Sequence, residues 1–307
     1  MTATKSSDTV DAAHETYLSR GHLPELDGLR ALAVVLVISF HLKDPLKNWL
    51  HGYLGVTVFF VLSGYLITML ALKEERAQGA LHLGAFYVRR IFRLMPLYYA
   101  VLLAYCVMYF GLGWSSARRP AFLQALPYYL TYLQEFPLFL KFSEQGIPFV
   151  HAWSLGIEEK YYLVWPLLAF AVWRGRGVVR RVGTLALGMA TGLAPLALGP
   201  EIGQFFFPYT HILIGCLTAL LLDDPAWFRR LAWLGRPAAG WLVVAGFVAA
   251  HLTFPRLEPE GGHLFHALYG VVTAVLLVSL LTGRSVVVER CPPARWSPSA
   301  SCPTACT

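Results

Sequence analysis

Long apolar blocks alternate with short polar stretches along most of this chain. An apolar helix of about 20 residues crosses the ~30 Å hydrocarbon core of a bilayer. We expect spans at about 26–43, 52–72, 94–113, 153–173, 182–199, 204–222, 238–254 and 264–282. The block 121–140 carries prolines as well as Gln134 and Glu135, so it either crosses or re-enters. The pattern predicts an all-α fold, a polytopic transmembrane helical bundle of about 8–10 spans.

Composition agrees with this class of protein. The 307 residues are 56% hydrophobic and 14% charged, and the mean hydropathy is +0.53. The chain is therefore too apolar for a soluble domain of its size. The net charge of +7 comes mostly from Lys and Arg in short loops, where they set orientation or meet anionic lipid. We expect the lipid bilayer, and no nucleic acid, as a partner.

The polar residues 1–20 predict a disordered cytoplasmic tail and show no cleavable signal peptide, so the first span would serve as the targeting signal. Basic loops at 174–181 and 229–236 fall on the side of the N-terminus if 121–140 does not cross, as the positive-inside rule prefers. We expect a multi-pass protein of the cell membrane with its N-terminus in the cytoplasm.

The first span carries two residues that can do chemistry, Arg30 and His41. Eleven helical steps of ~100° amount to about three turns plus ~20°, so both side chains share one face, roughly 16 Å apart along the axis. A cation and an imidazole are costly in lipid and usually face a protein interior or an aqueous path. The alternative is that Arg30 snorkels to headgroups and His41 is interfacial.

Two further stretches suggest binding. Arg89, Arg90 and Arg93 alternate with apolar residues before the third span, where they either meet headgroups or hold a phosphorylated ligand. Small residues in the second span, Ser63 and Gly64, allow a helix or a ligand to approach closely.

Residues 151–162 place several polar and aromatic side chains at the start of a span. Ser154 and Glu158 suit a helix N-terminus, so capping is one explanation of the carboxylate. Capping does not explain why His151, Trp153 and Tyr161 gather around it.

Taken together, these motifs resemble the membrane-bound acyltransferase-3 family of sugar and macrolide O-acyltransferases. The matching stretches are Leu26-Asp-Gly-Leu-Arg30 with His41, Gly55 to Gly64, Phe86 to Pro96, and Trp153 to Tyr162 followed by Trp165-Pro166. Their order and spacing over about 140 residues make the resemblance specific, whereas the second half matches only as a run of spans.

The resemblance implies about ten spans and transfer of an acyl group, commonly acetyl, from acyl-CoA to a hydroxyl of a glycan or macrolide-type acceptor. It implies that Arg30, His41 and Glu158 are catalytic, with His41 as general base or acyl carrier. Acyl-CoA, a co-substrate rather than a bound cofactor, would contact Arg89, Arg90, Arg93, Ser63 and Gly64. His151, Trp153, Tyr161 and His211 would lie on the acceptor side, although His211 is more simply a core histidine.

Two other functions remain open from the sequence. Intramembrane Arg, His and Glu would also suit a transporter or flippase that moves a glycan or lipid. An inactive, truncated acyltransferase is the third possibility. We expect no metal site, because the five cysteines form no ligand pattern. Thr57 stands where the family often has an acid, which removes one charge partner for an arginine.

The end of the chain departs from the family. We divide it into a tail 1–20, an acyltransferase-like transmembrane domain 21–283 and an aberrant tail 284–307, whose last residues carry four prolines and three cysteines. One choice of G/C-rich codons for 294–307, read in another frame, encodes a span with the Ser-Tyr motif expected of the family's last helix. The sequence therefore suggests a frameshift and a bundle that lacks this helix, which the genomic reading frame would decide.

Overall fold

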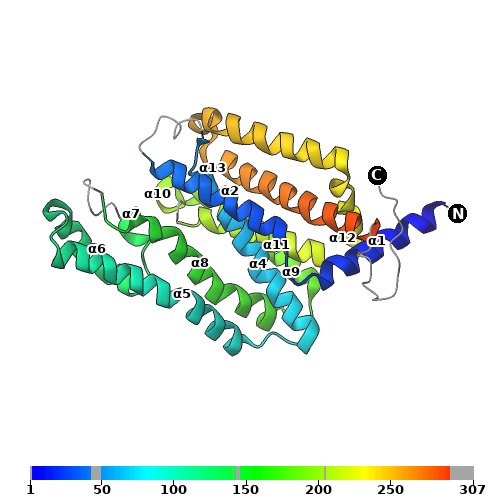
Figure 1. The fold of residues 1–307 in the computed structure, drawn as a ribbon, viewed down its shortest axis with the longest axis horizontal. Helices are drawn as coiled ribbons and strands as arrows, with labels where there is room; N and C mark the ends of the chain where they lie inside the picture. Colours follow the sequence, from blue (N-terminus) through cyan, green and yellow to red (C-terminus); the bar gives the residue numbers. More distant parts are fainter. Residues whose placement is uncertain (1, 43–49, 141, 143–145, 204, 291–307) are drawn as a thin grey trace, which may run out of the picture.

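The computed structural model describes residues 2–42, 50–140, 142, 146–203 and 205–290, and this part of the chain is helical without a strand (Figure 1). It confirms an all-α, polytopic bundle. The helices of the first half are α1 (Thr2–Ser19), α2 (Pro24–His41), α4 (Leu54–Gln78), α5 (Leu83–Cys106), α6 (Arg119–Leu130), α7 (Phe136–Phe139) and α8 (Trp153–Pro166). Those of the second half are α9 (Gly177–Leu198), α10 (Pro200–Gly203), α11 (Phe207–Asp223), α12 (Pro225–Leu231) and α13 (Pro237–Arg290).

Several helix ends follow local rules. Pro24 opens α2, and Glu25 and Asp27 lie in its first turn, where negative charge suits the helix dipole. Gly79 ends α4 with a φ of 75°, a left-handed conformation that glycine adopts without strain. The π-helical turns η1 (Val107–Gly111) and η4 (Leu167–Val172) extend α5 and α8, and 3₁₀ turns occur at η2 (Ser116–Arg118), η3 (Val150–Ala152) and η5 (Ala232–Gly235).

The N-terminal residues correct one expectation, because they form α1 instead of a disordered tail. Val10, Ala13, Tyr17 and Leu18 repeat at helical spacing and pack on the core, a stripe hidden among polar residues. The Tyr17 hydroxyl lies 2.8 Å from that of Tyr65 in α4. α1 is therefore part of the bundle.

Fewer helices meet a strict span criterion than the sequence predicts. Among the described residues four are long and apolar enough: Leu54–Gln78, Leu83–Gly111, Gly177–Leu198 and Leu264–Gly283. A fifth span results if α11 and the segment Pro225–Gly235, bent by 103°, count as one. α2 does not meet this criterion because its 18 residues include three charged ones, Glu25, Asp27 and Arg30. Pro237–Thr253 is apolar but shorter.

The block 121–140 does not cross as one helix. α6 has 12 residues, about 18 Å, and α7 has four. The turn between them is held by Lys160 of α8, whose Nζ donates to the Tyr132 carbonyl at 2.8 Å and lies 2.7 Å from Glu135 Oε1. The block therefore consists of two short helices joined by a turn, and whether it re-enters the membrane stays a prediction.

The centre of the bundle is a close crossing of α4 and α11. A Cβ at Gly64 would lie 1.9 Å from the Ile212 carbonyl oxygen, and one at Gly215 would lie 2.0 Å from that of Val61. Glycine at both positions lets the two backbones touch, as small residues do between membrane helices.

α13 folds back, so its two arms lie side by side (Figure 1). His251 Nδ1 in the first arm is 2.9 Å from the Tyr269 hydroxyl in the second, although a straight helix would separate these residues by about 27 Å. The final residues 291–307, on which the frameshift hypothesis depends, lie outside the described residues.

Candidate functional site

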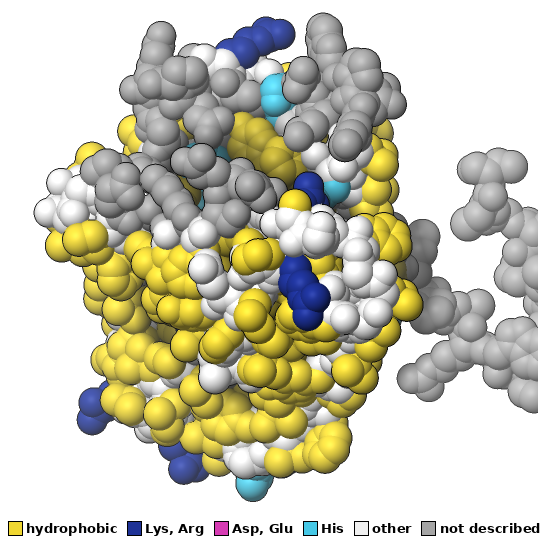
Figure 2. Space-filling view, turned by 90° about the vertical axis from the view of Figure 1, so that its left-hand side faces the viewer, with side chains coloured by type: hydrophobic (Ala, Val, Ile, Leu, Met, Phe, Trp, Pro, Cys, Tyr) yellow, Lys and Arg dark blue, Asp and Glu magenta, His cyan; other side chains and the backbone are white. Residues whose placement is uncertain are grey.

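A cavity of about 650 Å³ opens at the end of the bundle where α2 ends and α8 begins. His41, His151, His211 and His266 line it together with Trp153. Figure 2 looks onto this end, where histidine side chains lie near hydrophobic ones. The structure thus brings together His41 and three of the residues expected on the acceptor side, which come from helices far apart in the sequence.

His41 has one ring nitrogen committed to the backbone. Its Nδ1 lies 2.8 Å from the Val37 carbonyl oxygen, one turn earlier in α2. A carbonyl only accepts, so Nδ1 carries the hydrogen and donates it. Neutral imidazole then has its lone pair on Nε2, which is the nitrogen available to take a proton or an acyl group.

His151 lies in the 3₁₀ turn just before α8. Its ring packs near Phe149 and Tyr105, with centroids 5.2 and 6.0 Å away. Partial burial, and then the nearby His41, lower the pKa of His151 from its ordinary value of 6.5. The cavity therefore holds a neutral imidazole beside His41 at neutral pH.

A polar cluster between α2, α4, α5 and α8 joins Arg30 to Glu158. The Tyr162 hydroxyl donates to Glu158 Oε2 at 3.1 Å, and the Ser63 hydroxyl also hydrogen-bonds Glu158. Arg30 lies close enough for its charge to act on Glu158 and on Arg90. The Arg90 guanidinium stacks over the Tyr162 ring, 5.0 Å from its centroid, which is a cation–π contact.

The polar cluster lies about one helical turn from the cavity. Ser154 lines the cavity, and Glu158 is four residues further along α8. Phe60 lines it too, and Ser63 is three residues further along α4. Residues three or four apart share a helix face. Arg30 lies by the cluster in the first half of α2, and His41 lines the cavity at the end of the same helix.

The arginines near the start of α5 separate into two groups. Arg90 is half-buried in the cluster, and the charge of the exposed Arg93 acts on it. Arg89 instead pairs with Glu74 at the surface. Consecutive helical residues point ~100° apart, so Arg89 lies on a different face of α5 from Arg90, and its contact with acyl-CoA stays a prediction.

Two other site predictions are corrected. The space beside Gly64 is filled by α11, so a helix rather than a ligand approaches there. Tyr161 points into the core: its hydroxyl is 3.1 Å from Cys216 Sγ and its ring stacks on Trp165. Its face of α8 packs against α11 instead of lining the cavity.

The structure also adds polar residues beside the cluster. Glu159 Oε1 and the Tyr132 hydroxyl are buried, and neither has a hydrogen-bond partner among the described residues. Gln134 is fully buried in the turn between α6 and α7, and its amide is likewise unpaired within that part of the chain. The only sequence signal was polar residues inside an apolar block. Among the described residues, no group of three His, Cys, Asp or Glu side chains could hold a metal ion.

Comparison with known proteins now gives the class. The family model described as "Acyltransferase domain", Acyl_transf_3, matches residues 23–288, and the chain belongs to this family of acyltransferases. It is 39% identical over 282 residues to "Peptidoglycan O-acetyltransferase OatA" of Listeria monocytogenes, covering 84% of this chain and 44% of the relative. It is 34% identical over 236 residues to "O-acetyltransferase OatA" of Staphylococcus aureus, covering 70% and 37%. The chain thus spans less than half the length of these relatives, and no solved structure matches it.

Proposed function

We propose that this membrane protein transfers an acetyl group from acetyl-CoA to a hydroxyl of a glycan, with peptidoglycan as the first acceptor to test. The observation that carries the proposal is the cavity around His41 with the Arg30–Glu158 cluster one turn away. The name of the Listeria relative supports a peptidoglycan acceptor. The family motifs in the first half of the chain, between Leu26 and Pro166, support a transferase rather than a transporter.

The donor would lie along α2. CoA is anionic, so Arg90, Arg93 and Arg30 suit its phosphates, while its extended arm directs the thioester toward His41. Eleven helical residues separate Arg30 from His41, about 16 Å along the axis. The extended arm of CoA can therefore reach from the arginines to the cavity.

His41 Nε2 supports two routes. As a base, it takes the proton of the acceptor hydroxyl while the oxygen attacks the thioester carbonyl; the C–S bond breaks and the CoA sulfur leaves. As an acyl carrier, Nε2 attacks the thioester carbonyl first, the C–S bond breaks and CoA leaves as the thiolate. The acceptor oxygen then attacks the acyl-imidazole, its proton passes to the thiolate, and the C–N bond breaks and restores the lone pair on Nε2. Both routes need the lone pair that the Val37 hydrogen bond leaves on Nε2.

The test uses the full chain in lipid nanodiscs with radiolabelled acetyl-CoA and soluble peptidoglycan fragments. We expect label in an alkali-labile ester on the fragments, and a loss of at least ~100-fold in rate for His41→Ala, the lower range for a catalytic acid–base group. His22→Ala is the matched control, because His22 is exposed and pairs with Asp27 at the surface.

The outcomes separate the alternatives. Full activity of His41→Ala would exclude the histidine roles. Binding or movement of the glycan without any label transfer would favour a transporter. Label retained on the protein after an acid-free quench, without acceptor, would select the acyl-carrier route.

A further inference from the structure

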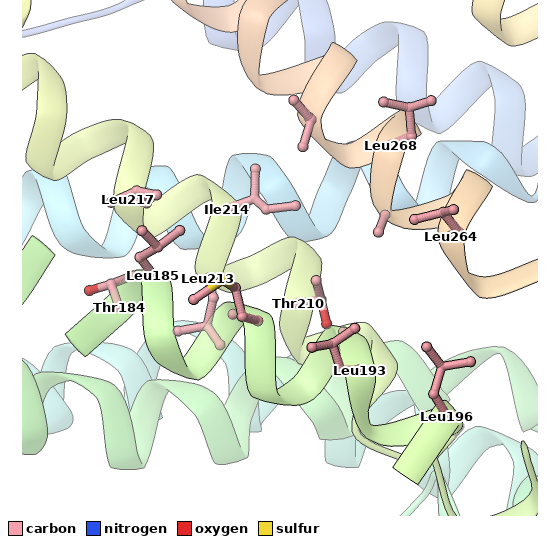
Figure 3. Close-up of a pocket in the computed structure, with 15 residues that line it drawn as sticks. Thr184, Leu185, Leu193, Leu196, Thr210, Leu213, Ile214, Leu217, Leu264 and Leu268 are labelled. Carbon is pink, nitrogen blue, oxygen red and sulfur yellow. The ribbon is translucent and has the colours of Figure 1, made fainter. Parts of the chain in front are cut away.

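A second cavity, the apolar groove, lies between α9, α11 and the second arm of α13 (Figure 3). Its volume is about 820 Å³, within the ~300–1,000 Å³ common for ligand pockets. Leucine side chains from all three helices point into it, among them Leu185, Leu213, Leu264 and Leu268. No lining residue carries a charge.

The two hydroxyls that line the groove, of Thr184 and Thr210, already donate hydrogen bonds within the protein. Thr184 Oγ1 donates to the Arg180 carbonyl at 2.5 Å. Thr210 Oγ1 donates to Thr191 Oγ1 at 2.9 Å. A polar ligand would lose its hydration in this groove and find neither a charge nor a free hydroxyl donor among these lining residues, and this loss is costly. The lining therefore selects hydrocarbon.

The shape of the groove is long and open to one side. The lining residues of α9 run from Thr184 to Leu196, about 18 Å, which exceeds half the ~30 Å hydrocarbon thickness. The rim is open, with Leu196 83% and Leu264 73% exposed, whereas Leu213 in the floor is buried. α9 and the second arm of α13 both qualify as membrane spans, so the open side faces lipid.

A helix is a poorer occupant than a lipid chain. Helix association in membranes uses small residues and interhelical hydrogen bonds. Gly188 and Gly192 line the groove but already pack on α11, since a Cβ at Gly192 would lie 3.4 Å from Thr210 Cγ2 and one at Gly188 would lie 3.7 Å from Leu213 Cβ.

The apolar groove lies back to back with the cavity that His41, His151, His211 and His266 line, which we call the histidine cavity. Thr210 lines the groove while its neighbour His211 lines the cavity. In the second arm of α13, Ala267 lines the groove and His266 lines the cavity. We propose that the apolar groove binds one hydrocarbon chain of a membrane lipid, held against the wall of the histidine cavity.

Photolabelling tests this proposal without any turnover. The full chain is reconstituted in phosphatidylethanolamine and phosphatidylglycerol vesicles that contain a phosphatidylglycerol with a diazirine in its acyl chain. After illumination, peptide mass spectrometry should find the adduct concentrated on α9 and the second arm of α13. Ala267→Trp, which fills the groove, should lower this labelling by about tenfold, the change that ~1.4 kcal/mol of lost binding produces.

Matched variants keep the test decisive. Leu103→Trp is the control, because Leu103 is 65% exposed on α5 and does not line the groove. If Ala267→Trp does not fold, Val271→Trp at the open rim replaces it, since Val271 is 47% exposed. His41→Ala should label like the wild type, so the result is independent of the proposed acetyl transfer.

Three outcomes would overturn the proposal: labelling of the groove no greater than that of the exposed face of α5, labelling unchanged by the tryptophan variants, or a cross-link between two copies through the groove. The last would assign the groove to a second copy of this chain.

Discussion

At the scale of single residues, hydrogen bonds decide which atoms of the site can react. The Val37 carbonyl fixes the hydrogen of His41 on Nδ1 and leaves Nε2 basic. Ser63 and Tyr162 donate to Glu158, and these two hydrogen bonds orient the carboxylate on which the charge of Arg30 acts. Glu159 Oε1 and the Tyr132 hydroxyl are buried and have no such partner within the part of the chain that the structure describes.

The pH dependence of acceptor binding should report on His151. Its pKa is lowered, so its ring stays neutral at pH values where an ordinary histidine, with a pKa of 6.5, is half protonated. If the neutral ring binds an acceptor hydroxyl, KM for the acceptor stays constant from pH 8 to below 6.5 and rises only at more acid pH. KM is measured across this range for the wild type and for His151→Gln.

The glutamine variant cannot titrate, so its KM should lack the acid rise. A wild-type rise centred at or above pH 6.5, or an identical rise in His151→Gln, would contradict this role for His151.

At the scale of elements, the site depends on two unusual contacts between helices. The crossing of α4 and α11 places Ser63 on one side of α4 while Gly64 meets α11 on the other. The turn between α6 and α7, tied to Lys160, carries polar groups into an apolar region beside α8. Pairing with Lys160 compensates the burial of Glu135, which alone would be costly.

Gly64→Ala should destabilise the protein strongly. The added Cβ would lie 1.9 Å from a backbone oxygen of α11, which cannot rotate away, so the helices must separate. Overpacking of this kind costs about 1–3 kcal/mol or more. Thermal unfolding in detergent should show a clear loss relative to Gly246→Ala, whose Cβ meets nothing within 4 Å. Equal melting of the two variants would show that the crossing is looser than described.

At the scale of the whole molecule, paired charges gather at the end of the bundle that holds α1 and is remote from the histidine cavity (Figure 1). Arg76 pairs with Asp223, Arg180 with Glu75 at 2.6 Å, and Arg181 with Asp224 at 2.6 Å. Arg229 reaches Asp11 of α1 at 3.4 Å. We infer that this end is cytoplasmic, because short basic loops favour that side.

Cysteine accessibility in intact cells tests this orientation. In a cysteine-free background, Glu15→Cys on α1 should resist a membrane-impermeant maleimide until the cells are opened, whereas Ser116→Cys at the other end should react at once. Both positions are exposed, so accessibility differs only by side. The reverse pattern would place the histidine cavity in the cytoplasm.

Helical spacing gave specific predictions about the candidate site. The periodicity within α2 predicted that Arg30 and His41 share a face, and the order of motifs predicted the family. Spacing could not predict which side chains pair with one another. Arg89 forms an ion pair with Glu74, and the Tyr161 hydroxyl lies 3.1 Å from Cys216 Sγ. It also overlooked α1, whose apolar stripe is short and lies among polar residues.

The sequence by itself determined the helical membrane class, the family and the position of the reactive residues along each helix, because these depend on hydropathy and on the fixed geometry of a helix. Only the tertiary structure decided which faces meet. The turn between α6 and α7, the crossing at Gly64, the meeting of four histidines and the apolar groove all depend on contacts between residues far apart in the chain, and local patterns carry no information about such contacts.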